Sequence, residues 1–167
     1  SDMKVLWEHD DSDDKDLGDN FGRPVIAKLN DGKWYGLVGN GYNSENGVAK
    51  LFIINLKNGK VVKRLTTGSG SPESPNGLSA PSLVDVDSDG VADVAYAGDI
   101  DGNMWKFDLS APKRWKWKLA YGRALHPGLG TRPITAAPEV ATHPLKGYLV
   151  YFATGRLYAE ADVKDTT

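Results

Sequence analysis

The segment PSLVDVDSDGVADVAYAG, residues 81–98, contains two apolar stretches separated by an acidic one. Residues 81–84 and 94–97 are rich in small, β-branched and aromatic side chains, which favour strands. The acidic stretch runs from residue 85 to residue 93 and has Gly90 at its sixth position. This pattern predicts two antiparallel strands joined by a nine-residue loop.

Four acidic side chains occupy the first, third, fifth and ninth positions of this loop: Asp85, Asp87, Asp89 and Asp93. Carboxylates this close repel one another unless a cation lies between them. Ca²⁺ suits a flexible loop of oxygen ligands better than Mg²⁺, which requires near-ideal octahedral geometry. We therefore predict a Ca²⁺ site formed by these four side chains, the backbone carbonyl of Val91 and water molecules.

The loop resembles an EF-hand calcium loop but lacks two of its features. An EF-hand has a glutamate at position 12 and a helix on each side. Here Tyr96 occupies position 12, and predicted strands flank the loop. The alternative interpretation is a hairpin turn without metal, because Asp-Gly is a common hairpin sequence.

A second acidic run lies near the N-terminus, at residues 10–16. Most runs of this kind are solvated loops, and this is the interpretation we favour. A second metal site is the alternative.

The strand pattern recurs along the chain with a period near 57 residues. Pro24, Pro81 and Pro138 lie 57 residues apart, and each opens a short apolar stretch. We predict repeats at approximately residues 23–67, 80–120 and 134–167. The predicted strands are 24–29, 33–39, 49–55 and 61–65, then 81–86, 94–98, 103–109 and 115–119, with a third round from 138 to 154. Asn58-Gly59 predicts a two-residue hairpin between the third and fourth strands.

Four short antiparallel strands per repeat, without helical periodicity, predict an all-β fold. A repeat of this length is typical of β-propeller blades, and closed propellers have about 4–8 of them. The chain holds about two and a half such units, so we expect residues 4–167 to be one domain, a fragment of a larger β-propeller. Residues 1–3 resemble a cloning scar. Open blade edges are expected to be covered or to pair with another copy of the chain.

The composition excludes several classes of function. The net charge of −2 gives no general attraction to nucleic acid or anionic membranes. The absence of cysteine excludes disulfides and thiolate chemistry. No apolar run approaches the ~18 residues of a membrane span.

The segment 113–118 alternates basic and aromatic residues. We predict a strand with Trp115 and Trp117 facing inward, and single-stranded nucleic acid binding is the alternative. Three further tryptophans are expected to pack between blades, with a sugar-stacking platform as the alternative: Trp7, Trp34 and Trp105.

The chain shows no catalytic motif. Its three histidines, His9, His126 and His143, lack the spacing of a zinc site. Neither a nucleophile elbow nor a phosphate-binding Gly-Lys-Ser/Thr loop is present. We therefore expect a protein that is not an enzyme.

Five segments together resemble the C-terminal propeller of the PilY/PilC family of type IV pilus proteins: FGRPVIA (21–27), GNGYNS (39–44), DVAYAGD (93–99), GNMWKFDL (102–109) and ITAAPEV (134–140). The resemblance extends over residues 19–167. The family's calcium motif, Asp-x-Asp/Asn-x-Asp-x-x-x-Asp, is matched by Asp85, Asp87, Asp89 and Asp93, with Val91 at the carbonyl position.

The resemblance implies a calcium-dependent module of an exported protein found at the bacterial surface or pilus tip. Such a protein supports pilus extension by opposing retraction, and its implied partners are pilins or minor pilins. Adhesion and twitching motility belong to the same family role. The blade pattern is also similar to that of quinoprotein dehydrogenases, at the level of fold alone. The alternatives are therefore a quinone-dependent dehydrogenase-like propeller and a host-glycan-binding adhesin module.

Overall fold

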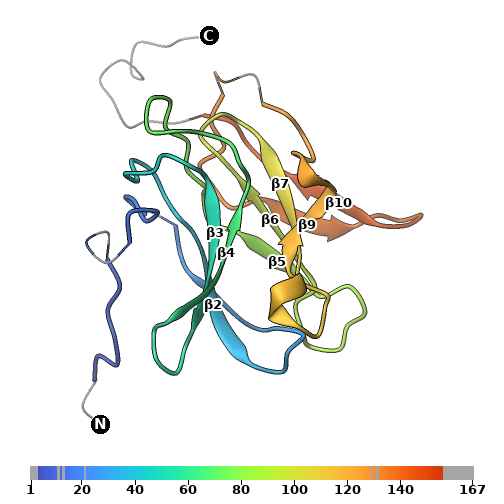
Figure 1. The fold of residues 1–167 in the computed structure, drawn as a ribbon. Coiled ribbons are helices and arrows are strands. Elements are labelled where there is room, and N and C mark those ends of the chain that lie inside the picture. Colours follow the sequence, from blue (N-terminus) through green and yellow to red (C-terminus); the bar gives the residue numbers. More distant parts are fainter. Residues whose placement is uncertain are drawn as a thin grey trace.

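The computed structural model describes residues 4–155 apart from 11, 13, 21, 129 and 131 (Figure 1). Within that part of the chain, the strands form three separate antiparallel sheets. The prediction of an all-β chain with four-stranded antiparallel sheets is confirmed. Residues 1–3 and the end of the third predicted repeat lie outside the described residues.

The first sheet follows the order of the sequence. Its strands are β1 (Val25–Lys28), β2 (Trp34–Gly39), β3 (Lys50–Asn55) and β4 (Val61–Thr66), each paired with the next. These bounds agree with the predicted strands to within one residue at each end. The agreement reflects the turn-forming residues that separate the apolar stretches.

The β3–β4 hairpin has a longer loop than predicted. The backbone N–H of Asn55 donates to the carbonyl of Lys60 at 2.9 Å, so residues 56–59 form the loop. The N–H of Gly59 donates back to the carbonyl of Asn55, and Gly59 adopts a φ of +68°. Asn58-Gly59 therefore turns the chain as the second half of a four-residue loop, and the prediction of a two-residue turn is wrong.

The second sheet repeats the same order, and the third has two strands in the described residues. The second comprises β5 (Ser82–Val84), β6 (Val94–Gly98), β7 (Met104–Asp108) and β8 (Lys118–Leu119). The third comprises β9 (Glu139–Thr142) and β10 (Tyr148–Tyr151). No helix in the described part of the chain is long and apolar enough to cross a membrane.

The fourth strand of the second sheet is shorter than predicted. Residues Arg114–Lys116 form a 3₁₀ turn, η1, and a second 3₁₀ turn, η2 (Ala120–Gly122), follows β8. A 3₁₀ turn has three residues per turn, so it breaks the alternation that would place Trp115 and Trp117 on one face. Trp117 is buried, as predicted, whereas Trp115 is 67% exposed, so its inward prediction is wrong.

The three remaining tryptophans differ in their surroundings. Trp105 is buried in the main core, which confirms its predicted packing role. Trp7 is half-buried, and its indole Nε1 donates to the carbonyl of Leu56 at 2.9 Å. Trp34 is 58% exposed because it lies on the face of the first sheet that points away from the second sheet, so its predicted burial is wrong.

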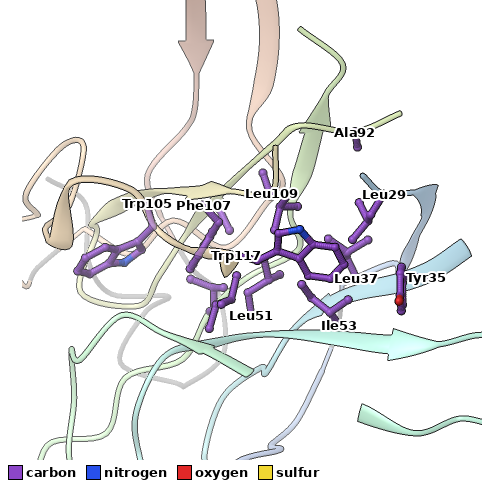
Figure 2. Close-up of a cluster of buried hydrophobic side chains, with 14 of the residues drawn as sticks. Leu29, Tyr35, Leu37, Leu51, Ile53, Ala92, Trp105, Phe107, Leu109 and Trp117 are labelled. Carbon is purple, nitrogen blue, oxygen red and sulfur yellow. The ribbon is translucent and has the colours of Figure 1, made fainter. Parts of the chain in front are cut away.

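The main hydrophobic core lies between the first and second sheets (Figure 2). The first sheet contributes Leu37 and Ile53, β7 of the second sheet contributes Phe107, and Trp117 lies just before β8. The Trp117 ring meets the Tyr35 ring edge-on, with 5.6 Å between centroids. Burying each large apolar side chain stabilises the fold by roughly 1.5–3 kcal/mol, so this core holds the two sheets face to face.

A smaller core lies between the second and third sheets. Its buried members are Val84, Val94, Tyr96, Met104 and Ile134. Partly buried apolar residues from β9, β10 and the segment after it pack against them: Val140, Tyr148, Val150 and Phe152. Sheets packed face to face in sequence order are the arrangement of propeller blades.

Candidate metal centre

The acidic loop connects β5 to β6 at one end of the second sheet. The N–H of Asp93 donates to the carbonyl of Val84 at 2.9 Å and closes the loop at its base. Gly90 adopts a φ of +84°, a left-handed conformation that glycine reaches without a steric penalty. Ser88 is also left-handed, with a φ of 64°, so the chain turns sharply between the acidic residues.

Three of the predicted ligands converge on one point. Asp85, Asp87 and Asp89 each place a carboxylate oxygen within 4.8 Å of the other two. Asp87 and Asp89 are exposed, and Asp85 is half-buried. Within the described residues, this is the one group of three acidic or histidine side chains arranged to hold a metal ion, and no histidine belongs to it.

Asp85 accepts hydrogen bonds from the loop's own backbone. Its Oδ1 accepts from the N–H of Ser88 at 2.7 Å and of Asp89 at 3.2 Å, and its Oδ2 accepts from the N–H of Gly90 at 2.7 Å. Desolvation is the largest influence on the pKa of Asp85 and raises it, but the three N–H donors together outweigh it and the pKa is lowered. Asp85 is thereby held as a carboxylate at the first position of the loop.

The pKa of Asp87 is shifted in the opposite direction to that of Asp85. Desolvation, followed by the negative charge of Asp89, raises the pKa of Asp87. The charges of Asp93 and Asp85 act in the same sense. Asp87 therefore carries a negative charge that the protein compensates poorly, and a bound cation would favour its ionised form.

Asp93 is buried, and its contacts differ from those of the other three acids. Its Oδ2 accepts from the N–H of Val86 at 2.8 Å, and its Oδ1 accepts from the side-chain amide of Asn30 at 2.9 Å. It lies outside the group of three converging carboxylates. Ligation by Asp93 and by the Val91 carbonyl stays a prediction.

Asn30 is a residue of this site that the sequence alone did not reveal. It lies just after β1, and its Nδ2 reaches three acceptors beside the strands β6 and β7 of the second sheet. These are Asp93 Oδ1 at 2.9 Å, the carbonyl of Leu109 at 3.2 Å and the carbonyl of Ala92 at 3.3 Å. The N–H of Ala92 also donates to the carbonyl of Lys28 at 3.0 Å. These bonds fix the acidic loop to the first sheet as well as to the second sheet, whose strands β5 and β6 it joins.

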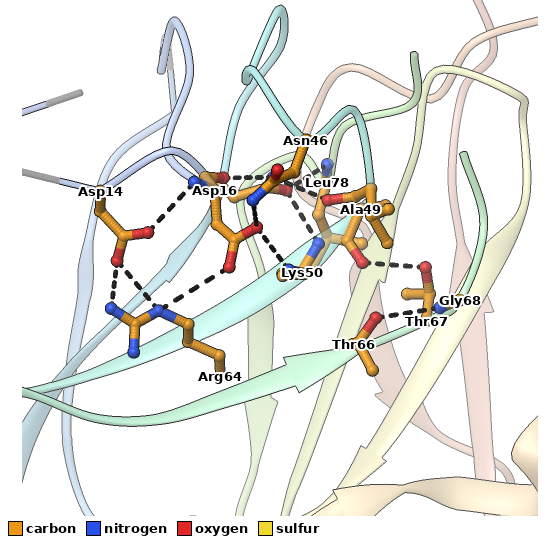
Figure 3. A network of polar contacts seen from close by, with 12 residues as sticks. Asp14, Asp16, Asn46, Ala49, Lys50, Arg64, Thr66, Thr67, Gly68 and Leu78 are labelled. Carbon is orange, nitrogen blue, oxygen red and sulfur yellow. Dashed lines mark hydrogen bonds and ion pairs between the residues drawn. The ribbon is translucent and has the colours of Figure 1, made fainter. Parts of the chain in front are cut away.

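The second acidic run has a different environment (Figure 3). Asp14 forms an ion pair with Arg64, and Asp16 forms one with Lys50. Asp16 also accepts from the side-chain amide of Asn46 at 2.7 Å. Both acidic side chains are largely buried, so the expectation of a solvated loop is wrong for them. Positions 11 and 13 lie outside the described residues.

The pKa of Asp16 is lowered as a result of these contacts. Desolvation is the largest influence and raises it, but the hydrogen bonds and charge from Lys50, together with Asn46 and Arg64, outweigh desolvation. The chain's own cations therefore compensate this run, and the pattern does not favour a second metal site.

The fold and the loop together define a class: an all-β propeller domain of four-stranded antiparallel sheets, with an exposed acidic triad at one turn. The model of the PilY1 beta-propeller domain family matches residues 2–167. The chain belongs to this family.

Two curated relatives illustrate the similarity. The chain is 40% identical over 187 residues to the type IV pilus biogenesis factor PilY1 of Pseudomonas aeruginosa, which covers 99% of the chain and 16% of that protein. It is 37% identical over 180 residues to a PilY1 homologue of Xylella fastidiosa, covering 97% of the chain and 12% of that protein. The chain therefore spans less than a fifth of the length of these relatives.

A solved structure agrees in fold. The crystal structure of the Pseudomonas aeruginosa PilY1 C-terminal domain superposes with a TM-score of 0.88 at 39% sequence identity. The match covers 96% of this chain and 37% of the other. The predicted resemblance to the family's C-terminal propeller is confirmed.

Proposed function

We propose that this chain is a Ca²⁺-binding propeller module of a type IV pilus biogenesis protein. The observation that carries the proposal is the convergence of Asp85, Asp87 and Asp89 at one turn of a PilY1-family propeller domain. Ca²⁺ prefers six to eight oxygen ligands in a flexible site, and a loop of carboxylates supplies them.

The ligands of this site are the side chains of Asp85, Asp87, Asp89 and Asp93 and the backbone carbonyl of Val91. The hydrogen bonds accepted by Asp85 and Asp93 are compatible with ligation, because each carboxylate oxygen has two lone pairs. Hydrogen bonds of this kind also orient a ligand before the ion arrives.

The ion stabilises a particular arrangement of the two sheets. When bound, it supplies the positive charge that the acidic triad lacks. Asp93 contacts the triad's loop through the N–H of Val86 and contacts the first sheet through Asn30. An ion held by this loop therefore favours the state in which β5, β6 and the β1–β2 turn are assembled.

The role in the pilus follows from the family. The relatives are type IV pilus biogenesis factors by name, and none of those names describes an enzyme. We propose that the intact protein is exported to the bacterial surface or pilus tip, contacts pilins or minor pilins, and supports extension by opposing retraction. The propeller's calcium occupancy would set whether that contact forms.

Calcium titration by calorimetry tests the site. The wild-type chain is expected to bind one Ca²⁺ ion, and Asp89→Ala is expected to lose that binding. Glu73→Ala is the matched control, because Glu73 is an exposed acid in a loop outside the acidic turn. Unchanged calcium affinity in Asp89→Ala would rule out this ligand set.

The pilus role needs a separate measurement. The intact protein carrying Asp89→Ala is expected to lower the number of surface pili, and disabling retraction is expected to restore it. If calcium binding is lost while piliation stays normal, the metal site stands and the pilus mechanism fails.

A further inference from the structure

The loop that joins β7 to β8 buries one tryptophan and presents another to solvent. The Trp117 side chain is 1% exposed, and its Nε1 donates to the carbonyl of Ala111 at 2.8 Å. Two residues earlier, Trp115 is 67% exposed. The turn η1 separates their directions, and in it the N–H of Lys116 donates to the carbonyl of Lys113 at 2.8 Å. Trp117 therefore anchors the loop in the main core, and the anchored loop holds the Trp115 indole outward.

Four exposed cations lie near Trp115. Lys113, Arg114 and Lys116 lie in or beside η1, and Lys33, from the β1–β2 turn, lines a surface pocket together with Trp115. The Nζ of Lys113 lies over the Trp115 ring, 5.7 Å from its centroid. None of the ion pairs among the described residues includes any of these four cations. Their positive charge is therefore available to an anion.

One carboxylate lines the same pocket, and the protein already engages it. The pocket has a volume of about 310 Å³ and lies between the β1–β2 turn and the β7–β8 loop. Figure 1 shows that loop, in amber, beside the blue turn that precedes β2. Asp31 Oδ2 accepts from the hydroxyl of Tyr35 at 2.6 Å, and its Oδ1 accepts from the N–H of Lys33 at 3.2 Å. The cations that line the pocket thus outnumber its carboxylate, which is turned to neighbouring donors.

The structure also removes the simplest explanation of the basic and aromatic alternation in segment 113–118. A strand with both tryptophans inward would explain the alternation without any ligand. The exposure of Trp115 contradicts that explanation, because only Trp117 is needed for the core. The net charge of −2 belongs to the whole chain, whereas binding of phosphates depends on where cations gather.

The combination of features at this surface fits one class of anion. A single exposed aromatic side chain is ordinary on a protein surface and indicates nothing by itself. An exposed indole among unpaired Lys and Arg side chains is typical of sites for single-stranded nucleic acid, where bases stack on aromatic rings and cations bind phosphates. An acidic peptide or a sulfated polysaccharide brings charge without a base to stack. The bases of a duplex are already stacked on one another.

We propose that the β7–β8 loop and the β1–β2 turn form a binding site for single-stranded nucleic acid. Trp115 stacks on one base, and Lys113, Arg114 and Lys116 bind the phosphates beside it. Lys33 extends the positive surface across the pocket. Stacking of this kind tolerates any base, so the site binds single strands without selecting a sequence.

Fluorescence anisotropy with two labelled oligomers tests the stacking contact. One is an oligothymidylate of about 12 nucleotides, and the other is an abasic oligomer with the same number of phosphates. The wild-type chain is expected to bind the oligothymidylate more tightly at low salt. Trp115→Ala is expected to weaken that binding by about tenfold and to leave binding of the abasic oligomer unchanged. Tyr151→Ala is the matched control, because Tyr151 is 57% exposed and lies on β10.

The salt dependence of the affinity tests the cations separately. For single strands, the logarithm of the affinity falls with the logarithm of the salt concentration by about 0.7 per neutralised phosphate. Lys116→Ala is expected to reduce this slope by about 0.7, whereas Trp115→Ala leaves it unchanged. Lys146→Ala removes an exposed cation from the β9–β10 turn and is expected to leave both the affinity and the slope unchanged.

Three outcomes would overturn the proposal. The first is no binding of the oligothymidylate at low salt. The second is equal binding of both oligomers without any effect of Trp115→Ala, which would make the surface a general anion site. The third is displacement of the oligothymidylate by a lower concentration of polyglutamate or heparin, which would make the partner an acidic protein or a sulfated polysaccharide. Thermal unfolding checks that each variant is folded, and Trp115→Leu, which has no ring face, replaces Trp115→Ala if the latter is not.

Discussion

The two acidic regions of this chain, residues 10–16 and 85–93, look alike in sequence and differ in how their charge is compensated. In the first, Asp14 and Asp16 form ion pairs with Arg64 and Lys50. In the second, Asp85, Asp87 and Asp89 form no ion pair with any residue that the structure describes, and they accept hydrogen bonds from backbone N–H groups instead. An acidic run predicts a metal site only when the fold brings no cation to it.

The largest expected effect is the loss of calcium binding when the second region is altered. Asp85→Ala is expected to weaken Ca²⁺ affinity by about a hundredfold or more, because it removes one carboxylate of the triad together with the acceptor of three backbone N–H bonds of the loop. Asp16→Ala removes an acid from the first region and is expected to leave the affinity unchanged. Calorimetric titration of the two variants sharpens the comparison, and equal losses in both would break it.

Removing calcium from the wild-type chain should produce the next largest effect. A ligand present at a hundred times its dissociation constant stabilises the folded state by about 2.7 kcal/mol. We therefore expect a chelator to lower the unfolding temperature of the wild type and to leave that of Asp85→Ala unchanged. A chelator effect of the same size in both proteins would place the stabilising ion elsewhere.

Asn30→Ala tests the connection between the acidic loop and the first sheet. It leaves Asp93 Oδ1 and two carbonyls without their amide donor, which should destabilise the metal-free chain by about 1–3 kcal/mol. It should also weaken calcium binding by about tenfold, the scale of losing a group that orients a ligand.

Urea unfolding and calcium titration measure these two effects. Asn58→Ala is the control, because the Asn58 side chain is exposed and accepts a hydrogen bond from the N–H of Lys60, away from the acidic loop. Full calcium affinity in Asn30→Ala would show that Asp93 does not depend on Asn30 for its position.

The smallest expected effect is the pH dependence of the first region. Because the pKa of Asp16 is lowered in the folded chain, its contribution to the free energy of unfolding is present above the unfolded pKa of 3.8. That contribution is lost as pH falls through the folded pKa. Asp16→Asn should therefore cost about 1 kcal/mol at neutral pH, and the difference from wild type should disappear in strong acid. Urea unfolding at several pH values measures the free energy of unfolding of both proteins. A difference between wild type and Asp16→Asn that persists in strong acid would contradict the prediction.

The sequence correctly predicted the features that depend on residues close together in the chain. The strands of the first sheet and the acidic turn between β5 and β6 follow from local apolar stretches and turn residues. It missed the ion pairs of Asp14 and Asp16, because Arg64 and Lys50 lie 50 and 34 positions away. It also missed the 3₁₀ turn that exposes Trp115, because alternation alone does not distinguish a strand from a tight turn.

The amide of Asn30 also bears on the order of events when the chain folds. Asn30 and Asp93 are 63 positions apart, so their contact closes a long loop and has a high entropic cost. The acidic turn itself is local and forms as soon as β5 meets β6. The turn's ninth position becomes fixed only after both sheets have come together. A newly made chain would therefore gain its full affinity for the ion last, and calcium capture would report that neighbouring blades have docked.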